Sequence, residues 1–80
     1  MTTYKFRPNE RAKQIFNFYA DYYVSGSLSD VFALAFGKGK EPEGLDHDNN
    51  GNKTHTVYLR KGTKHNQTRG RLTIGVVEVK

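Results

Sequence analysis

A run of basic residues near the C-terminal end has the composition best suited to binding a charged partner. Residues 60–71 combine five permanent cations and one histidine with amide and hydroxyl donors, and they contain no acid. The basic residues are Arg60, Lys61, Lys64, His65, Arg69 and Arg71. Lys and Arg neutralise phosphate charge and release counterions, and Arg donates two parallel hydrogen bonds. Tyr58 lies next to this run and offers an aromatic face on which an unpaired base can stack.

The charge of the chain is concentrated in its last third. The 80 residues carry a formal net charge of +5, but residues 1–52 hold 6 Lys/Arg against 7 Asp/Glu, whereas residues 53–80 hold 7 Lys/Arg against Glu78 alone. Such a one-sided excess favours an acidic partner, either nucleic acid or an acidic protein surface. The sequence also leaves open a simpler interpretation, in which the charges only keep edge strands from aggregating.

Catalytic chemistry has weaker support. The candidates for a general base are His47, His55 and His65, but their spacing matches no zinc-binding helix and no nucleophile motif. The sequence contains no phosphate-binding or dinucleotide-binding glycine motif. We therefore predict no catalytic residues and no cofactor. Among enzymes, a ribonuclease that uses His65 beside the surrounding cations would fit best.

Residues 46–51 match the opening of an EF-hand calcium loop, with oxygen ligands at positions one, three and five and glycine at position six. The twelfth position is Val57 instead of the bidentate glutamate. We therefore predict a polar turn here and no metal site, and leave weak calcium binding open.

These observations predict a non-enzymatic binding module that grips a polyanion, nucleic acid in the first place, through a basic C-terminal hairpin. The alternative is a small inhibitor or adaptor that docks on another protein, such as a nucleic-acid-processing enzyme. The identity of the partner, DNA against RNA, and whether the chain forms a homodimer remain open at this level.

The elements that must position these residues begin with a short strand over residues 3–7, where polar and aromatic residues alternate. Asn9 is a helix cap, and an apolar stripe at three- and four-residue spacing predicts a helix that continues until Ser25-Gly26-Ser27. The stripe consists of Ala12, Ile15, Phe16, Tyr19, Tyr22 and Tyr23. Ser27 and Asp30 resemble a capping box, which predicts a second helix from about Leu28 to Phe36. A buried strand is the alternative, because periodicity does not decide so short an apolar run.

Residues 38–54 are rich in Gly, Asn, Asp, Lys and Glu, and this predicts a long polar loop that is flexible. Strands are predicted over residues 56–60 and 71–79, which are rich in β-branched residues, with a flexible hairpin loop over residues 61–70. The chain is thus expected to be a single α+β domain over residues 1–80, with two helices packed on a small antiparallel sheet in the order β-α-α-β-β.

The composition also bears on the environment of the chain. With no cysteine, it has no disulfide framework. It shows no signal peptide and no run long enough to span a bilayer. We expect a cytoplasmic protein without a membrane partner.

Overall fold

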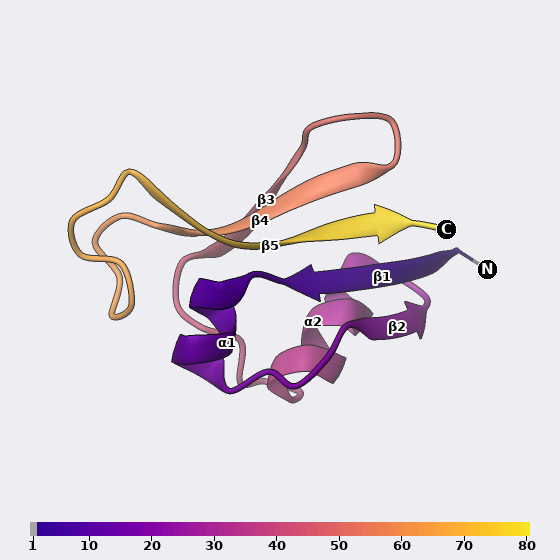
Figure 1. Cartoon of the computed structure of the whole chain (residues 1–80), viewed down its shortest axis with the longest axis horizontal. Coiled ribbons are helices and arrows are strands. Elements are labelled where there is room, and N and C mark those ends of the chain that lie inside the picture. Colours follow the sequence, from indigo (N-terminus) through magenta and orange to yellow (C-terminus); the bar gives the residue numbers. More distant parts are fainter. Residues whose placement is uncertain (1) are drawn as a thin grey trace.

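The computed structural model describes residues 2–80 and consists of a five-stranded antiparallel sheet and two helices (Figure 1). The elements are β1 (Thr3–Pro8), α1 (Glu10–Phe16), β2 (Tyr22–Ser25), α2 (Leu28–Phe36), β3 (Leu45–Asn49), β4 (Thr54–Arg60) and β5 (Arg71–Val79). The strands lie in the order β2-β1-β5-β4-β3, so that β5 is central and β2 and β3 form the two edges. The predicted α+β class is confirmed, but the predicted order β-α-α-β-β is wrong, because two further strands are present.

The first helix is shorter than predicted. Asn9 caps it as expected, since its side chain accepts a hydrogen bond from the backbone N–H of Ala12. The helix nevertheless ends at Phe16, because Asn17 adopts the left-handed conformation (φ 58°, ψ 40°), which asparagine tolerates better than most residues. The tyrosines assigned to the helical stripe lie beyond this point, and residues 22–25 form β2.

The second helix, α2, is confirmed over Leu28–Phe36. The capping box is complete: Asp30 N–H donates to Ser27 Oγ at 3.3 Å, and Ser27 N–H donates to Asp30 Oδ2 at 2.7 Å. The helix ends at Gly37, whose φ of 97° suits a residue without a side chain. This helix packs against β1 and β2 and covers part of one face of the sheet.

The predicted polar loop over residues 38–54 contains strand β3, and this part of the prediction is wrong. β3 pairs antiparallel with β4, and the chain turns over residues 50–53, where Asn50 N–H donates to the carbonyl of Thr54 at 3.1 Å. An edge strand with one solvated face can be built largely from polar residues, because only alternate side chains meet the core. The polar turn that we predicted over residues 46–51 is thus confined to its last two residues.

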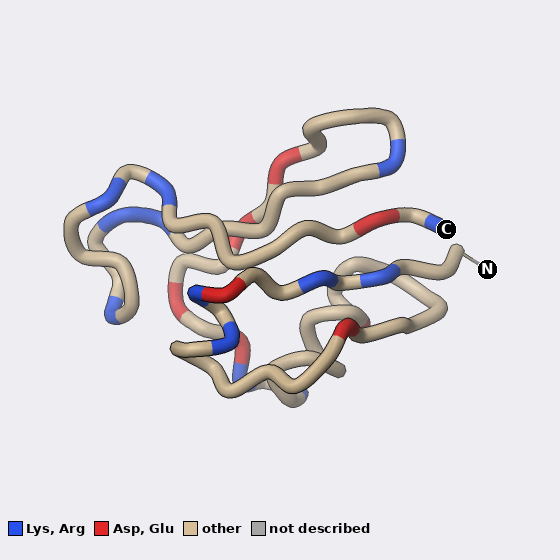
Figure 2. The backbone as a smooth tube through the Cα atoms, in the orientation of Figure 1, with Lys and Arg blue, Asp and Glu red and all other residues tan. Residues whose placement is uncertain are grey.

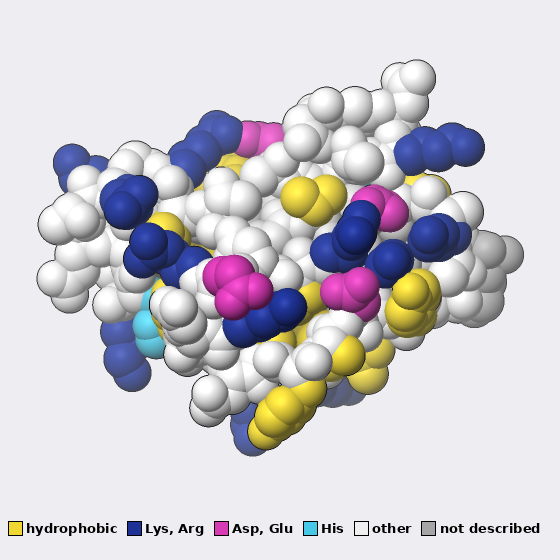
Figure 3. Space-filling model, viewed as in Figure 1, with side chains coloured by type: hydrophobic (Ala, Val, Ile, Leu, Met, Phe, Trp, Pro, Cys, Tyr) yellow, Lys and Arg dark blue, Asp and Glu magenta, His cyan; other side chains and the backbone are white. Residues whose placement is uncertain are grey.

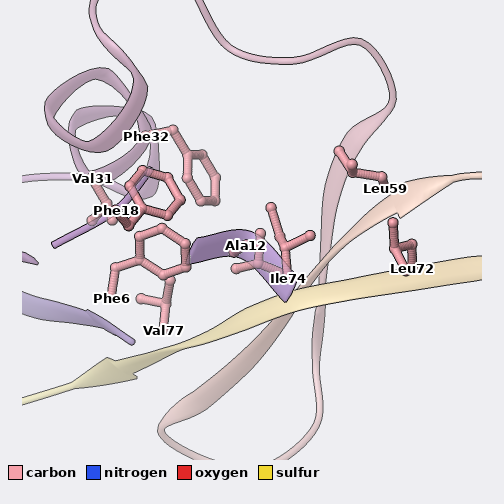
Figure 4. Packing of buried hydrophobic residues seen from close by; sticks show 10 residues of the cluster. Phe6, Ala12, Phe18, Val31, Phe32, Leu59, Leu72, Ile74 and Val77 are labelled. Atoms are coloured by element: carbon pink, nitrogen blue, oxygen red, sulfur yellow. The ribbon is translucent and has the colours of Figure 1, made fainter. Parts of the chain in front are cut away.

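The predicted C-terminal strands are confirmed as β4 and β5, with β4 starting two residues earlier than expected. Their side chains and those of β1 meet the helices in a core centred on Phe6, which is fully buried (Figure 4). The ring of Phe6 meets Phe18 and Phe32 edge to face, with centroids 5.8 and 6.3 Å apart. β1 and β5 can approach here because residue 75 is glycine, and a Cβ on it would lie 2.6 Å from the carbonyl oxygen of Arg7.

Candidate polyanion-binding surface

The loop over residues 61–70, predicted to be flexible, has its own hydrogen-bond framework around Asn66. This residue is 4% exposed, and its Nδ2 donates to the carbonyl of Leu59 at 2.7 Å. Its Oδ1 accepts from the N–H of Arg69 at 3.1 Å, and its carbonyl accepts from Gly62 and Thr63 at 2.8 and 3.2 Å. One buried side chain therefore links the two arms of the loop to the end of β4.

Thr63 attaches the loop to the segment before β3. Its Oγ1 donates to the carbonyl of Arg60 at 3.0 Å, and the N–H of Arg60 donates to the carbonyl of Gly44 at 2.9 Å. Gly44 has φ 78°, and a Cβ there would lie 2.3 Å from Thr63 Cγ2. Glycine is required at this position for two reasons: the positive φ would strain a residue with a side chain, and that side chain would displace Thr63.

The loop also packs against α1. The ring of His65 meets the ring of Phe16 edge to face, with centroids 5.1 Å apart. His65 is half-buried by this contact, and no hydrogen bond within residues 2–80 orients its ring nitrogens. The contact gives His65 a packing role at the junction of the loop with α1.

Three of the predicted cations remain free on this loop. Lys61, Lys64 and Arg69 are exposed, and within residues 2–80 none of them forms an ion pair. Figure 2 shows the basic residues of the loop at one end of the molecule, and Figure 3 shows Lys and Arg side chains gathered over that end. The three cations therefore belong to one projecting surface.

Arg60, at the end of β4, and Arg71, at the start of β5, are each paired with a carboxylate. Arg60 Nε lies 3.3 Å from Asp46 Oδ2, and the guanidinium of Arg71 pairs with Asp48. Asp46 and Asp48 lie two residues apart on β3 and therefore project from the same face of the sheet. The predicted set of five cations is thus divided into three free cations and two that share their charge with carboxylates.

Tyr58 is held between these two ion pairs. Its hydroxyl donates to Asp46 Oδ2 at 3.1 Å and lies 3.4 Å from Asp48 Oδ1, and the guanidinium carbon of Arg71 lies 4.4 Å from its ring centroid. The side chain is only 5% exposed. A base could stack on the ring only if Arg71 moved aside, so the geometry gives no support to the stacking role that we predicted for Tyr58.

The hydrogen bonds of this cluster also affect its ionisation. The backbone N–H of His47, 2.8 Å from Asp46 Oδ1, lowers the pKa of Asp46, and the hydroxyl of Tyr58 and the charge of Arg60 act in the same direction. Burial, followed by the hydrogen bond to Asp46, raises the pKa of Tyr58. At neutral pH, Asp46 is therefore an anion and Tyr58 is a neutral donor.

The other two candidate general bases, His47 and His55, lie on the opposite face of β3 and β4. The ring centroid of His47 lies 5.5 Å from that of His55 and 6.2 Å from that of Phe32 in α2. The Nδ1 atoms of both histidines are buried and have no hydrogen-bond partner. Within residues 2–80, no group of three or more His, Cys, Asp or Glu residues is placed to hold a metal ion.

Sequence reasoning did not predict the structural roles of Thr63 and Asn66, nor which cations Asp46 and Asp48 would meet. The spacing of the two aspartates was compatible with one face of a strand, but only the register of β3 on β4 reveals which cations they meet. Asn66 gave no signal, because a polar residue between glycines is typical of any exposed loop.

Comparisons of the chain with models of known families, with curated proteins and with solved structures find no match. In the part of the chain that the structure describes, no helix is long and apolar enough to cross a membrane. The geometry of the loop and of the sheet is therefore the basis for proposing a function.

Proposed function

We propose that the chain is a non-enzymatic module that binds a polyanion, nucleic acid in the first place, through the exposed cations of the 61–70 loop. The observation that carries this proposal is that Lys61, Lys64 and Arg69 are exposed on one loop without an ion pair in residues 2–80. Phosphates that replace the counterions of such cations release those ions, and this gain does not depend on base sequence.

The hydrogen bonds of Asn66 and Thr63 strengthen this proposal. They define the loop backbone before any partner is present, so that binding needs to order only the side chains of the cations. Arg60 and Arg71 are expected to contribute less than the loop cations, because a phosphate must compete with Asp46 and Asp48 for their guanidinium groups.

The experiment is a salt titration of binding to labelled single-stranded RNA, single-stranded DNA and duplex DNA. Three phosphate contacts predict a slope of log K against log[salt] of roughly −2 to −3. Each of the single variants Lys61→Ala, Lys64→Ala and Arg69→Ala should make this slope shallower by about one unit. Binding that does not respond to salt would reject the proposal.

A matched control is available at the other end of the same strands. Lys53 precedes β4, Lys80 follows β5, and the backbone N–H of Val79 donates to the carbonyl of Lys53 at 2.8 Å. The double variant Lys53→Ala/Lys80→Ala removes as much charge as Lys61→Ala/Lys64→Ala. An equal loss of affinity in both doubles would mean that net charge, and not the loop, is responsible.

The alternative function, an inhibitor or adaptor that docks on a protein, is supported by a different observation. Among residues 2–80, three large hydrophobic side chains are strongly exposed: Tyr19 at 93%, Tyr23 at 58% and Leu34 at 52%. Exposed aromatic side chains are common anchors of protein interfaces. A stoichiometric protein partner that survives nuclease treatment, and that Tyr19→Ala weakens, would favour this function over the first.

A further inference from the structure

The two edge strands of the sheet differ in how they are protected from pairing with another strand. Proteins usually protect an edge with charged side chains, proline or a bulge. The edge strand β3 carries Asp46 and Asp48. The edge strand β2 has the sequence Tyr22-Tyr23-Val24-Ser25 and carries none of these features.

The hydrogen bonds of the neighbouring strands show which groups of β2 face outward. The N–H of Gly26 donates to the carbonyl of Thr2 at 2.9 Å, while the carbonyl of Thr3 accepts from Lys80 on the other side of β1. Bonding direction alternates along an antiparallel strand, and Thr3 is opposite Ser25. The backbone N–H and C=O groups of Tyr23 and Ser25 therefore point away from β1, and within residues 2–80 no backbone group meets them.

The surroundings of this edge are largely apolar. Tyr19 and Tyr23 are 93% and 58% exposed, and Figure 3 shows hydrophobic side chains over β2 and the segment that leads into it. The charges beside this edge are Asp21, which pairs with Lys5 at 3.6 Å, and Asp30, whose Oδ2 accepts a hydrogen bond from the N–H of Ser27 at 2.7 Å. The loop over residues 61–70, which carries the free cations, lies at the opposite end of the molecule from β2 (Figure 1).

We propose that β2 pairs antiparallel with β2 of a second copy of this chain, which joins the two sheets into one. A second copy fits because such a strand is complementary to itself about a two-fold axis through Tyr23, where each outward N–H meets the outward C=O of the other copy. The two Tyr23 side chains then lie opposite each other on the open face, where aromatic cross-strand pairs are favourable.

Side-chain character favours β2 over β3 as the interface between copies. Pairing β3 with its own copy would bring together Asp46 and Asp48 of each chain, whose carboxylates are already engaged with Arg60 and Arg71. Pairing β2 brings together strands without a charged residue of their own and places the exposed Tyr23 of each chain opposite the other. The dimer would also carry two copies of the basic loop on one rigid body, although the pairing itself does not depend on what the loop binds.

The test is sedimentation velocity of the purified chain across a wide range of protein concentration. We expect a concentration-dependent species of twice the 9.1 kDa chain mass. Ser25→Pro removes an outward N–H and leaves the backbone hydrogen bonds between β2 and β1 intact, although it also removes the hydroxyl that meets Thr3 Oγ1 at 3.1 Å. It should weaken dimerisation by about tenfold or more. Ser25→Thr keeps the N–H and is the matched control.

A second variant keeps the test decisive if proline disturbs the fold. Tyr23→Lys places two like charges opposite each other in the dimer and should also yield a monomer, while Tyr23→Phe should keep the dimer. A wild-type chain that stays monomeric up to its solubility limit would overturn the proposal, and so would a dimer that both Ser25→Pro and Tyr23→Lys leave intact.

Discussion

At the β3 edge of the sheet, Asp46 and Asp48 project onto the open face and pair with Arg60 and Arg71, while the β2 edge presents Tyr23 and has no charged residue in the strand itself. The same carboxylates that protect the β3 edge also remove two cations from the basic segment. A cluster of charges in the sequence therefore overstates the charge that is free on the surface. The number of free cations is decided by the register between neighbouring strands, because this register brings acidic residues of one segment next to basic residues of another.

The largest expected effect is on the β3 side, through the buried Asn66. Asn66→Ala leaves the carbonyl of Leu59 and the N–H of Arg69 without their partner, which should destabilise the fold by about 2 kcal/mol. Chemical denaturation measures the loss, and Gln67→Ala, an exposed neighbour, is the control. Hydrogen exchange should show that the loss of protection is larger in β4 than in β2, and equal losses in both would contradict the division into two regions.

The second effect concerns the carboxylates that distinguish the two edges. Asp46→Asn/Asp48→Asn frees Arg60 and Arg71 and removes two negative charges beside the loop, so it should tighten polyanion binding by about tenfold and steepen its salt dependence. The double variant Glu41→Gln/Glu43→Gln removes the same charge from residues without an ion pair in the described chain. Affinity that falls in the aspartate variant would mean that the carboxylates position the arginines for binding instead of competing for them.

A somewhat smaller effect on stability is expected from a substitution between β3 and β4. His55 has a buried Nδ1 without a hydrogen-bond partner, and a β-branched apolar residue would remove that unsatisfied group. His55→Val should therefore raise the free energy of unfolding by about 1 kcal/mol. Thermal and urea unfolding would measure the gain. A loss of stability would show that the imidazole ring makes a contribution that its contacts do not reveal.

The smallest expected effect is on the pH dependence of the free energy of unfolding. It involves one carboxylate on the edge strand β3, Asp46, and one on the central strand β5, Glu78. Hydrogen bonds lower the pKa of Asp46, through the N–H of His47, and of Glu78, through Arg7 at 2.8 Å. The unfolded chain then binds more protons in acid than the folded chain, so stability is complete above roughly pH 5 and falls below about pH 4. Asp46→Asn and Glu78→Gln should each flatten part of this fall in acid unfolding curves, and an unchanged curve in both would refute the assignment.

Local signals in the sequence predicted part of the fold correctly. The capping box of Ser27 and Asp30 and the β-branched residues of β4 and β5 act within a few residues of where they stand. The tyrosines of residues 19–23 misled because their spacing continues the helical stripe, although the helix ends at the left-handed residue Asn17. Tyr22 and Tyr23 are then adjacent residues of β2 and project from opposite faces of the sheet.

The sequence predicted which basic residues belong to the candidate surface, but it did not predict which of them form ion pairs. Exposed Lys61, Lys64 and Arg69 follow from composition, whereas the pairing of Arg71 with Asp48 spans 23 residues and depends on the position of β4 between β3 and β5. β3 itself was hidden, because most of its residues are polar and only its alignment with β4 makes it a strand.

The central position of β5 has a consequence for how the chain reaches its native state. β1 and β2 form one antiparallel pair, β3 and β4 form another, and only β5 joins them. During synthesis, the backbone N–H and C=O groups of β1 and β4 that face β5 have no partner until β5 leaves the ribosomal exit tunnel. Assembly of the whole sheet is therefore expected only once β5 has left the tunnel, with slow closure of long-range contacts, and a nascent chain stalled before Arg71 should be a target for chaperones and proteases.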